Sequence, residues 1–227
     1  MARIILVRHG ETDWNKQEIF RGRMDVNLNQ NGIKQAEAIG EELKERKLDV
    51  VYSSPLSRAQ LTAKIIADYH NLEVNVEQGF VDLNYGKWQG ISHEDVKAQY
   101  PELYALWQKQ PHLVKFPAGE CLDDVRHRTI NTLEKIISKH NSDTVAIVAH
   151  RVVNKVMLCA VLGLETSHFW LIRQDTCCIN IFEDSLIGFD TLRTQPDGTQ
   201  PKGYVLYCLN DTCHLKHLKK DIVTADF

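Results

Sequence analysis

Two apolar segments of the sequence, each the length of a buried β-strand, end on a histidine. Residues 3–7 lead into Arg8 and His9, and residues 143–149 lead into His150. Near-continuous apolar runs are typical of the central strands of a parallel sheet, in which both faces are covered. The carboxyl ends of parallel strands meet along one edge, and open α/β sheets bind their ligands there. We therefore expect the two histidines at one edge of the same sheet.

The rest of the sequence alternates between helix and strand patterns. Apolar residues recur at helical spacing in segments 33–46, 55–69, 123–140 and 152–162. Further strands are expected at 48–53, 73–76, 178–182, 188–192 and 204–209, with a turn or loose hairpin tip at 194–203. This alternation predicts an α/β fold, a three-layer α/β/α sandwich around a mostly parallel sheet.

Segment 83–120 differs in residue composition from the segments on either side. Its short polar and aromatic pieces contain Tyr85, Trp88, Tyr100, Tyr104 and Trp107, and are interrupted by Pro101, Pro111 and Pro117. We expect this segment to be a small helical lid inserted into the sheet domain.

The chain has 227 residues, of which 43% are apolar, enough for one sizeable core. Residues 1–227 are therefore expected to form a single domain.

Charge and hydropathy exclude several classes of partner. The formal net charge is -3, and no cluster of Lys and Arg extends further than residues 216–220, so nucleic acid is not an expected partner. The apolar runs are shorter than the roughly 18 residues that a membrane span requires. The first residues meet Arg8 before an apolar signal-peptide core can form. We expect a cytoplasmic protein with no membrane partner.

The cysteines give no sign of disulfide bonds or of a metal centre. None of the six forms a C-x-x-C pair, so reduced thiols are expected in a protein without an export signal. The tightest cluster of potential ligands comprises Cys208, Cys213, His214 and His217. Its spacing fits no standard zinc pattern. No metal site and no cofactor are expected.

The residues at the strand ends suit the binding of a phosphate dianion. His9, Arg8 and His150 end the two apolar strands, and Arg58 lies in the first turn of the helix expected at 55–69. Guanidinium groups match phosphoryl oxygens bidentately, and a neutral imidazole can attack phosphorus. Cationic side chains stabilise the charge of the transition state without a metal. Taken alone, a histidine at a strand end is more often a hydrogen-bonded structural residue, so the combination carries the inference.

The same residues belong to a wider pattern, which resembles the histidine phosphatase superfamily in its phosphoglycerate mutase-like branch. The matching runs are Leu6-Val7-Arg8-His9-Gly10-Glu11-Thr12, Phe20-Arg21-Gly22, Val51-Tyr52-Ser53-Ser54-Pro55-Leu56-Ser57-Arg58-Ala59, Gly86-Lys87-Trp88-Gln89-Gly90, Pro117-Ala118-Gly119-Glu120 and Val148-Ala149-His150. The resemblance covers about residues 1 to 185. The tail Asn210-Asp211-Thr212-Cys213-His214-Leu215 is similar to the end of the metal-independent phosphoserine phosphatases of this branch.

The resemblance implies a catalytic role for each residue of the proposed phosphate site. It implies that His9 is the nucleophile that becomes phosphorylated. Arg8, Arg58 and His150 would bind the phosphoryl group. The general acid of the family is a glutamate four residues before the first glycine of the G-x-W-x-G run, and Asp82 stands at that position here. Although Asp is one methylene shorter, it can still protonate a leaving oxygen. The alternative role for Asp82 is that of a cap or turn residue.

Further residues are expected to bind the substrate. The resemblance implies that Asn15 assists phosphate binding, and that Arg21 and Gly22 form part of the pocket wall. Tyr85, immediately before the G-x-W-x-G run, is the best candidate for contact with the organic part of the substrate. The alternative is that the aromatic residues of segment 83–120 form only the small core of a lid.

This sequence departs from the family pattern at three positions. Besides Asp82, it has Cys121 where the family usually has Ser, and Arg151 where Gly or Thr commonly follows the second histidine. Loss of the Ser hydroxyl would remove a contact, and Arg151 could either add a cation at the rim of the site or point away from it. The departures motivate the alternative of a non-catalytic phosphate-binding scaffold.

The function expected first is that of a metal-independent phosphomonoesterase that hydrolyses small phosphorylated metabolites through a phosphohistidine at His9, with phosphoserine-like substrates favoured. Alternatives within the branch are a broad-specificity or ribazole-phosphate phosphatase, and then a cofactor-dependent phosphoglycerate mutase. The mutases carry consecutive arginines in a longer lid, and no Arg-Arg pair occurs between Gly90 and Glu120.

Apolar strands near 178–192 could pair with a second copy, so a homodimer is also expected.

Overall fold

A mixed six-stranded sheet lies at the centre of the molecule, in the order β3-β2-β4-β1-β5-β6. The computed structural model describes residues 1–185 and 203–221. The strands are β1 (Arg3–Arg8), β2 (Val50–Ser53), β3 (Val74–Val76), β4 (Thr144–Ala149), β5 (Ile179–Ser185) and β6 (Gly203–Asp211). β1, β2, β3 and β4 are parallel to one another, whereas β5 is antiparallel to both of its neighbours, β1 and β6.

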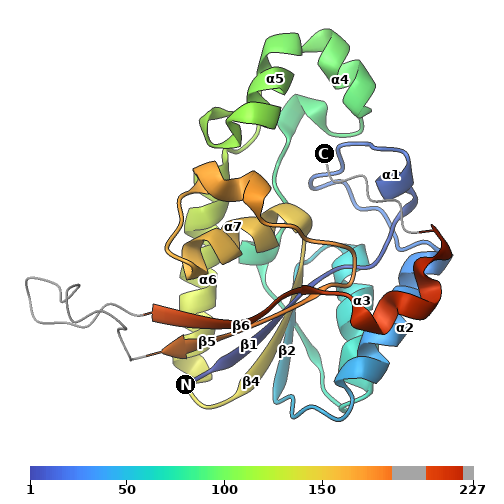
Figure 1. Ribbon diagram of the computed structural model, residues 1–227, viewed down its shortest axis with the longest axis vertical. Coiled ribbons are helices and arrows are strands. Elements are labelled where there is room, and N and C mark those ends of the chain that lie inside the picture. The colour runs from blue at the N-terminus through green and yellow to red at the C-terminus, as the bar shows by residue number, and fades with distance from the viewer. Residues whose placement is uncertain (186–202, 222–227) are drawn as a thin grey trace, which may run out of the picture.

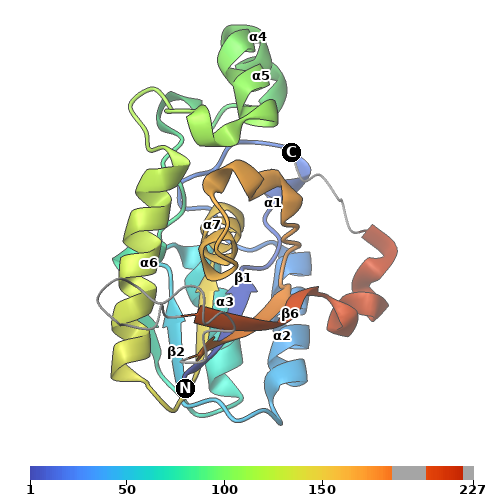
Figure 2. The ribbon, with the colours of Figure 1, turned by 60° about the vertical axis from the view of Figure 1, so that its left-hand side comes forward.

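Helices cover both faces of this sheet (Figures 1 and 2). The α-helices are α1 (Asp13–Lys16), α2 (Gln30–Leu43), α3 (Ser57–Asp68), α4 (His93–Gln99), α5 (Pro101–Lys109), α6 (Leu122–Lys139) and α7 (Arg151–Val161). Alternate residues of β1 belong to different apolar clusters: Ile4 and Leu6 pack with α6 and α7, and Ile5 and Val7 pack with α2 and α3. This alternation follows from the two-residue repeat of a strand. The predicted α/β/α sandwich is confirmed.

Helix boundaries differ from the sequence-based expectations by a few residues. One difference with a clear cause is at α3, which was expected to begin at Pro55. Leu56 has an extended backbone (ψ 138°), so the helix begins at Ser57. Arg58 is consequently the second residue of the helix rather than the fourth, at the end nearest the carboxyl edge of the sheet. α2, expected at 33–46, begins earlier because the side chain of Asn29 caps it by accepting a hydrogen bond from Gly32 N.

Segment 83–120 stands beyond the carboxyl ends of the parallel strands, where Figure 1 shows α4 and α5 at the top of the molecule. Its short helices are held together by aromatic rings that pack edge to face. The ring centroids of Trp88 and Phe116 lie 4.9 Å apart, and those of Trp107 and Phe116 lie 5.2 Å apart. Trp107 also packs against Phe169, which links the segment to the sheet domain. The aromatic residues therefore place α4 and α5 over this edge of the sheet.

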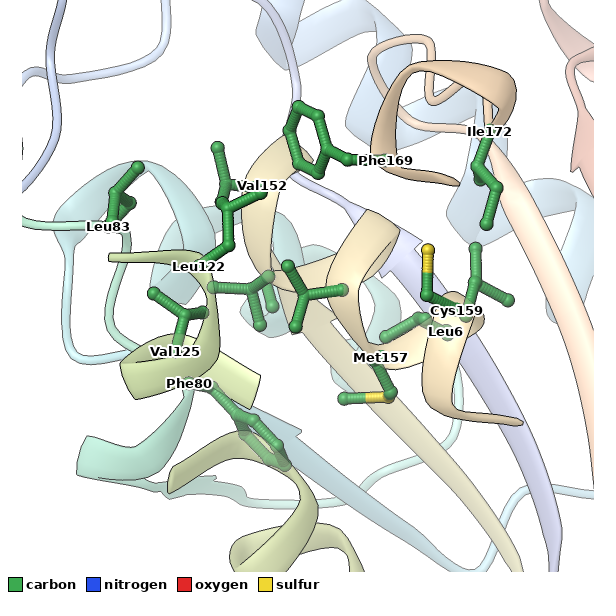
Figure 3. Close-up of a cluster of buried hydrophobic side chains, with 14 of the residues drawn as sticks. Leu6, Phe80, Leu83, Leu122, Val125, Val152, Met157, Cys159, Phe169 and Ile172 are labelled. Atoms are coloured by element: carbon green, nitrogen blue, oxygen red, sulfur yellow. The ribbon is translucent and has the colours of Figure 1, made fainter. Parts of the chain in front are cut away.

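The larger apolar cluster supports the chain on both sides of Asp82. Phe80 and Leu83 are completely buried, and Figure 3 shows them in the same cluster as Val125 of α6 and Val152 of α7. Asp82 therefore lies between two anchored apolar residues, which fix the course of the backbone at this position.

Some expectations fall on residues outside the described part of the chain. These are the strand at 188–192, residues 194–202 of the expected turn, and the side chains of residues 219–221. Within the described residues, no helix is both long enough and apolar enough to cross a membrane.

Candidate active site

His9 follows β1 and is almost completely buried, with 1% of its surface exposed. Its Nδ1 lies 2.7 Å from the carbonyl oxygen of Gly10, which can only accept a hydrogen bond, so Nδ1 carries the proton and Nε2 carries the lone pair. Burial lowers the pKa of His9 well below 6.5, and the charges of Arg58, Arg21 and Arg8 lower it further. His9 is therefore a neutral imidazole whose unprotonated nitrogen is Nε2.

His150 lies beside His9 because β4 is the parallel neighbour of β1. The two ring centroids are 5.2 Å apart. His150 Nε2 lies 2.6 Å from Oγ of Ser54, a residue just beyond the end of β2. Burial, together with the charge of Arg58, lowers the pKa of His150 well below its usual value. Three neighbouring strands thus place His9, His150 and Ser54 at one edge.

Arg58 is completely buried and is held by three hydrogen bonds. Its guanidinium donates to the carbonyl oxygens of Met24 (2.9 Å) and Gly22 (2.8 Å), and to Oδ2 of Asp82 (3.2 Å). Its Nε has no hydrogen-bond partner among the described residues. Burial lowers the pKa of Arg58, with a smaller contribution from Arg8. A dehydrated guanidinium in a fixed position, with a donor left over, is suited to binding an oxyanion.

Asp82 stands beside both Arg58 and His150. Its Oδ2 lies 3.8 Å from His150 Nδ1, and its Oδ1 accepts a hydrogen bond from Leu83 N at 2.9 Å. Arg128 of α6 fixes the backbone at this point by donating to the carbonyl oxygens of Val81 (2.6 Å) and Asp82 (3.1 Å). The carboxyl group is therefore held at the site by its own backbone as well as by ion pairing.

The loop that contains Arg21 and Gly22 forms another wall of the site. Gly22 has φ +51°, and a Cβ atom there would lie 2.7 Å from the backbone oxygen of Leu83. Glycine is therefore required for the loop to pass this close to the backbone beside Asp82. Asn15 lies in the adjacent short helix α1, where its Oδ1 accepts a hydrogen bond from Thr12 N at 2.9 Å.

These residues surround a pocket of about 510 Å³, including its open mouth. The lining residues are Arg8, Trp14, Asn15, Glu18, Ile19, Phe20, Arg21, Gly22, Asp82, Tyr85, His93, Arg151 and Val152. His9, His150 and Arg58 do not line the open part of the pocket. They lie behind the lining, where Asp82 contacts both Arg58 and His150. The structure thus brings together all ten residues that the sequence singled out.

Tyr85 and Arg151 meet on one wall of the pocket. The Tyr85 side chain is hydrogen-bonded to Arg151, and burial raises the pKa of Tyr85 to about 12, so the hydroxyl stays protonated. The Tyr85 ring packs edge to face against Phe20 and Phe116, with centroid distances of 5.0 Å in both cases. Tyr85 therefore belongs to the aromatic core of segment 83–120 and also lines the pocket. Arg151 faces the pocket rather than pointing away from it.

Cys121 takes over the helix-capping role that a serine would have. It precedes α6, where its side chain accepts a hydrogen bond from the backbone N–H of Asp124. In return, Asp124 Oδ2 accepts a hydrogen bond from Cys121 N at 2.9 Å. This reciprocal pair satisfies N–H groups at the start of the helix. The substitution at this position is therefore compatible with the local fold.

Sequence reasoning missed several residues that support the site. Arg128 gave no signal beyond its place in an amphipathic helix, and Gln174 gave none at all. The Arg8 guanidinium donates to the backbone oxygen of Gln174 at 2.5 Å. The Gln174 side chain donates to Oδ1 of Asn180 (2.7 Å), and Asn180 donates back to it (2.9 Å). Asn180 in turn donates to Leu6 O in β1, so this buried pair ties Arg8 to its own strand.

The comparisons with known proteins agree with this geometry. Residues 4–193 match the histidine phosphatase superfamily (branch 1). The chain is 37% identical over 215 residues to phosphoserine phosphatase 1 of Hydrogenobacter thermophilus, covering 95% of each protein. A solved phosphoserine phosphatase mutant from Entamoeba histolytica, in complex with phosphoserine, superposes with a TM-score of 0.78 at 25% identity, covering 95% of this chain and 100% of that one. The Bacillus stearothermophilus YhfR structure shares the fold, with a TM-score of 0.85 at 24% identity and coverage of 95% and 100%.

The fold, the site and these similarities define the class of the protein. The chain belongs to the histidine phosphatase superfamily, branch 1. It is a phosphoric monoester hydrolase.

The buried amide pair under Arg8 predicts a loss of stability when it is broken. Gln174→Met keeps the approximate size of the side chain but removes both hydrogen bonds that join it to the buried amide of Asn180. We expect the free energy of unfolding to fall by about 2 kcal/mol, measured by urea denaturation. Gln60→Met, at an exposed position on α3, is the matched control and should change it by less than about 0.5 kcal/mol. Equal effects of the two substitutions would contradict this interpretation of the network.

Proposed function

We propose that the protein is a metal-independent phosphomonoesterase that works through a phosphohistidine on His9. The observation that carries this proposal is the hydrogen bond from His9 Nδ1 to the Gly10 carbonyl, made within a cluster of buried arginines. The hydrogen bond leaves Nε2 free to attack, and burial together with the charges of the arginines keeps the ring unprotonated. Few structural roles for a buried histidine call for so much positive charge around it.

The first step transfers the phosphoryl group from the substrate to His9. Nε2 forms a bond to phosphorus while the bond from phosphorus to the leaving oxygen breaks, and that oxygen takes a proton from Asp82. In the second step, water attacks the phosphohistidine and gives its proton back to Asp82, which releases inorganic phosphate and restores His9. Asp82 suits both steps because Arg58 and His150 hold its Oδ2 at the closed end of the site.

Arginine side chains supply the charge stabilisation in this proposal. Arg8 and Arg58 hold the phosphoryl oxygens, and His150, fixed by Ser54, contributes a further polar contact. The guanidinium groups are positioned before the substrate arrives, because Gln174 anchors Arg8 and the carbonyls of Met24 and Gly22 anchor Arg58. Preorganised donors of this kind stabilise the charge of the transition state without reorganising.

The proposed substrate is a small phosphorylated metabolite, with phosphoserine favoured. Support comes from the phosphoserine phosphatase of Hydrogenobacter thermophilus, similar along 95% of both chains.

We further propose that residues 1–227 form one domain acting in the cytoplasm, with segment 83–120 as its lid. The position of α4 and α5 over the mouth of the site supports the role of a lid, because excluding water strengthens the electrostatic interactions beneath it.

The strand expected at 178–182 does not form an edge, because β5 lies between β1 and β6. We therefore propose a homodimer built on β6, which lies at the edge of the sheet. Tyr207 and Leu209 of this strand are 61% and 45% exposed, respectively. Among the residues that the structure describes, no strand pairs with the outer side of this nine-residue strand, and such an edge with exposed apolar side chains favours pairing with a second copy.

Removing the nucleophile should abolish turnover. We expect wild-type hydrolysis of p-nitrophenyl phosphate to survive EDTA, and His9→Ala to lose activity by at least about 1,000-fold, because no other side chain then forms the phosphoenzyme. His127→Ala, at an exposed position on α6, is the matched control and should retain activity. Mass spectrometry of quenched wild type should find acid-labile phosphate on His9. Phosphate on His150 or on a serine would contradict the assignment.

The role of Asp82 predicts a dependence on the leaving group. Asp82→Asn should slow the hydrolysis of alkyl phosphates by about 100-fold, because an alkoxide needs the proton, and should slow p-nitrophenyl phosphate much less. Asp68→Asn, at an exposed position on α3, serves as the control. Steady-state kinetics with the two substrates measure the difference. An equal loss on both would show that Asp82 does not donate the proton.

The dimer proposal predicts a sedimenting species of twice the 26.1 kDa chain mass. Leu209→Lys should dissociate it, because a charge on an exposed edge strand opposes pairing. Analytical ultracentrifugation over a range of concentrations measures both. A single 26.1 kDa species at every concentration would refute the proposal.

A further inference from the structure

The two ends of segment 83–120 meet beside Asp82. Glu120 N donates to the carbonyl oxygen of Asn84 at 2.9 Å, and Asn84 N donates to Oε2 of Glu120 at 2.9 Å. These two hydrogen bonds join the chain that enters the segment to the chain that leaves it. Because Asn84 follows Asp82 by two positions, the Glu120 side chain is tied to the backbone that carries the proposed general acid.

Two arginines complete the contacts of the Glu120 carboxylate. Arg128 of α6 donates to it twice, from Nε to Oε1 (3.0 Å) and from Nη2 to Oε2 (3.1 Å). Arg23 donates from Nη2 to Oε1 at 2.8 Å. A carboxylate has about four acceptor sites, and these bonds, together with the one from Asn84 N, occupy them. The paired approach of Arg128 fixes the orientation of the carboxylate as well as its position.

Both arginines also hold the backbone of Asp82. Its carbonyl oxygen accepts a hydrogen bond from Arg128 Nη2 at 3.1 Å and another from Arg23 Nε at 3.4 Å. Two guanidinium groups therefore converge on one carbonyl oxygen, and their like charges repel. The carboxylate of Glu120 is bonded to both groups and offsets one of the two charges. Removing its charge would take away their shared counter-ion and loosen the backbone at Asp82.

Arg23 extends this network to the loop that supports Arg58. It follows Gly22, whose carbonyl oxygen accepts a hydrogen bond from Arg58 at 2.8 Å. Arg23 N donates to Oε1 of Gln89 at 2.8 Å, which adds a further tie between this loop and the chain that follows Asp82. Arg58 in turn donates to Oδ2 of Asp82. The general acid and the arginine that pairs with it are thus held through one set of contacts.

The network differs from an ordinary surface ion pair in its burial and in what it connects. Lys64 and Asp68 lie on adjacent turns of α3, with 67% and 58% of their side chains exposed, and exposed pairs of this kind contribute little. Only 16% of the Glu120 side chain and 19% of the Arg128 side chain are exposed. These two residues connect α6 with both loops of the site. Their pairing therefore acts on the relative positions of separate segments.

We propose that Glu120 is a positioning residue for Asp82. By holding the two arginines together, its carboxylate fixes the backbone from which the Asp82 carboxyl reaches the leaving oxygen. Asp has one side-chain torsion fewer than Glu, so it has less freedom to compensate for a displaced backbone. Displacement of a catalytic group by about 1 Å costs about 100-fold in rate. The inference rests on the proposed hydrolytic function, and it adds the residue that keeps the acid within reach.

The dependence of the rate on the leaving group tests this role. Phosphoserine releases an alkoxide that needs a proton, whereas p-nitrophenyl phosphate releases a stable phenolate. The ratio of kcat/KM for phosphoserine to that for p-nitrophenyl phosphate therefore reports protonation by Asp82. Glu120→Gln keeps the size of the side chain, removes its charge and turns an N–H group toward a guanidinium. We expect it to lower the ratio by about 10-fold in steady-state kinetics.

Further variants test whether the effect passes through the acid. In an Asp82→Asn background the ratio has already fallen, so adding Glu120→Gln should lower it no further. Arg128→Met should lower the ratio about as much as Glu120→Gln. Glu134→Gln, at an exposed position on the same helix as Arg128, is the matched control and should leave the ratio unchanged. Because each ratio is taken within one variant, a fraction of unfolded protein does not affect it.

Arg23→Gln keeps the proposal testable if the other variants fold poorly. The Arg23 side chain is 39% exposed, so its replacement is compatible with folding. The substitution removes one of the two guanidinium contacts of Glu120 and should lower the ratio by about 3-fold.

The outcomes separate this inference from the function on which it rests. A ratio that falls in Asp82→Asn but in none of the three single variants of the network would overturn the positioning role and leave the phosphatase proposal standing. A further fall in the double variant would show that Glu120 acts independently of Asp82, and would overturn the positioning role as well. Failure of wild type to hydrolyse either phosphate would overturn the proposed function itself.

Discussion

Positive charge packed around two buried imidazoles is the constraint on which the rest of the site depends. Arg58, Arg21 and Arg8 surround His9, and burial together with these charges keeps the ring neutral. Like charges at close range repel, so each guanidinium needs its own support. Arg58 is held by backbone carbonyls and by Asp82. Arg8 is held by the backbone of Gln174.

The fold supplies this support from elements that are distant in the sequence. Parallel pairing of β1 with β4 and of β4 with β2 brings His9, His150 and Ser54 to one edge. The apolar cluster beneath α6 and α7 anchors the residues on either side of Asp82, as Figure 3 shows for Phe80 and Leu83. The precision of the polar site therefore comes from close packing of apolar side chains, which resists small displacements.

The parts of this architecture that the sequence predicted are those with a local signal. Strand periodicity, the ending of two strands on histidine and the position of Arg58 in a first helical turn depend on residues near one another in the chain. The loop at Gly22 was expected only from the family resemblance. The roles of Arg128 and Gln174 depend on contacts between distant elements, for which a single sequence gives no local signal. Gln174, for example, contacts Arg8 across 166 positions of sequence separation. The start of α3 was misplaced because Pro55 is compatible both with a first helical turn and with the extended segment found there.

Charge and hydrogen bonding together assign a specific protonation state to His9, and this state is the central claim of the account. A ¹⁵N NMR titration of the imidazole in the free enzyme, with the His9 signals assigned by their loss in His9→Ala, tests the claim most directly. The account predicts a protonation midpoint well below 6.5, with the proton of the neutral ring on Nδ1 and a bare Nε2. A protonation midpoint at or above about 6.5, or a proton on Nε2 of the neutral ring, would contradict it.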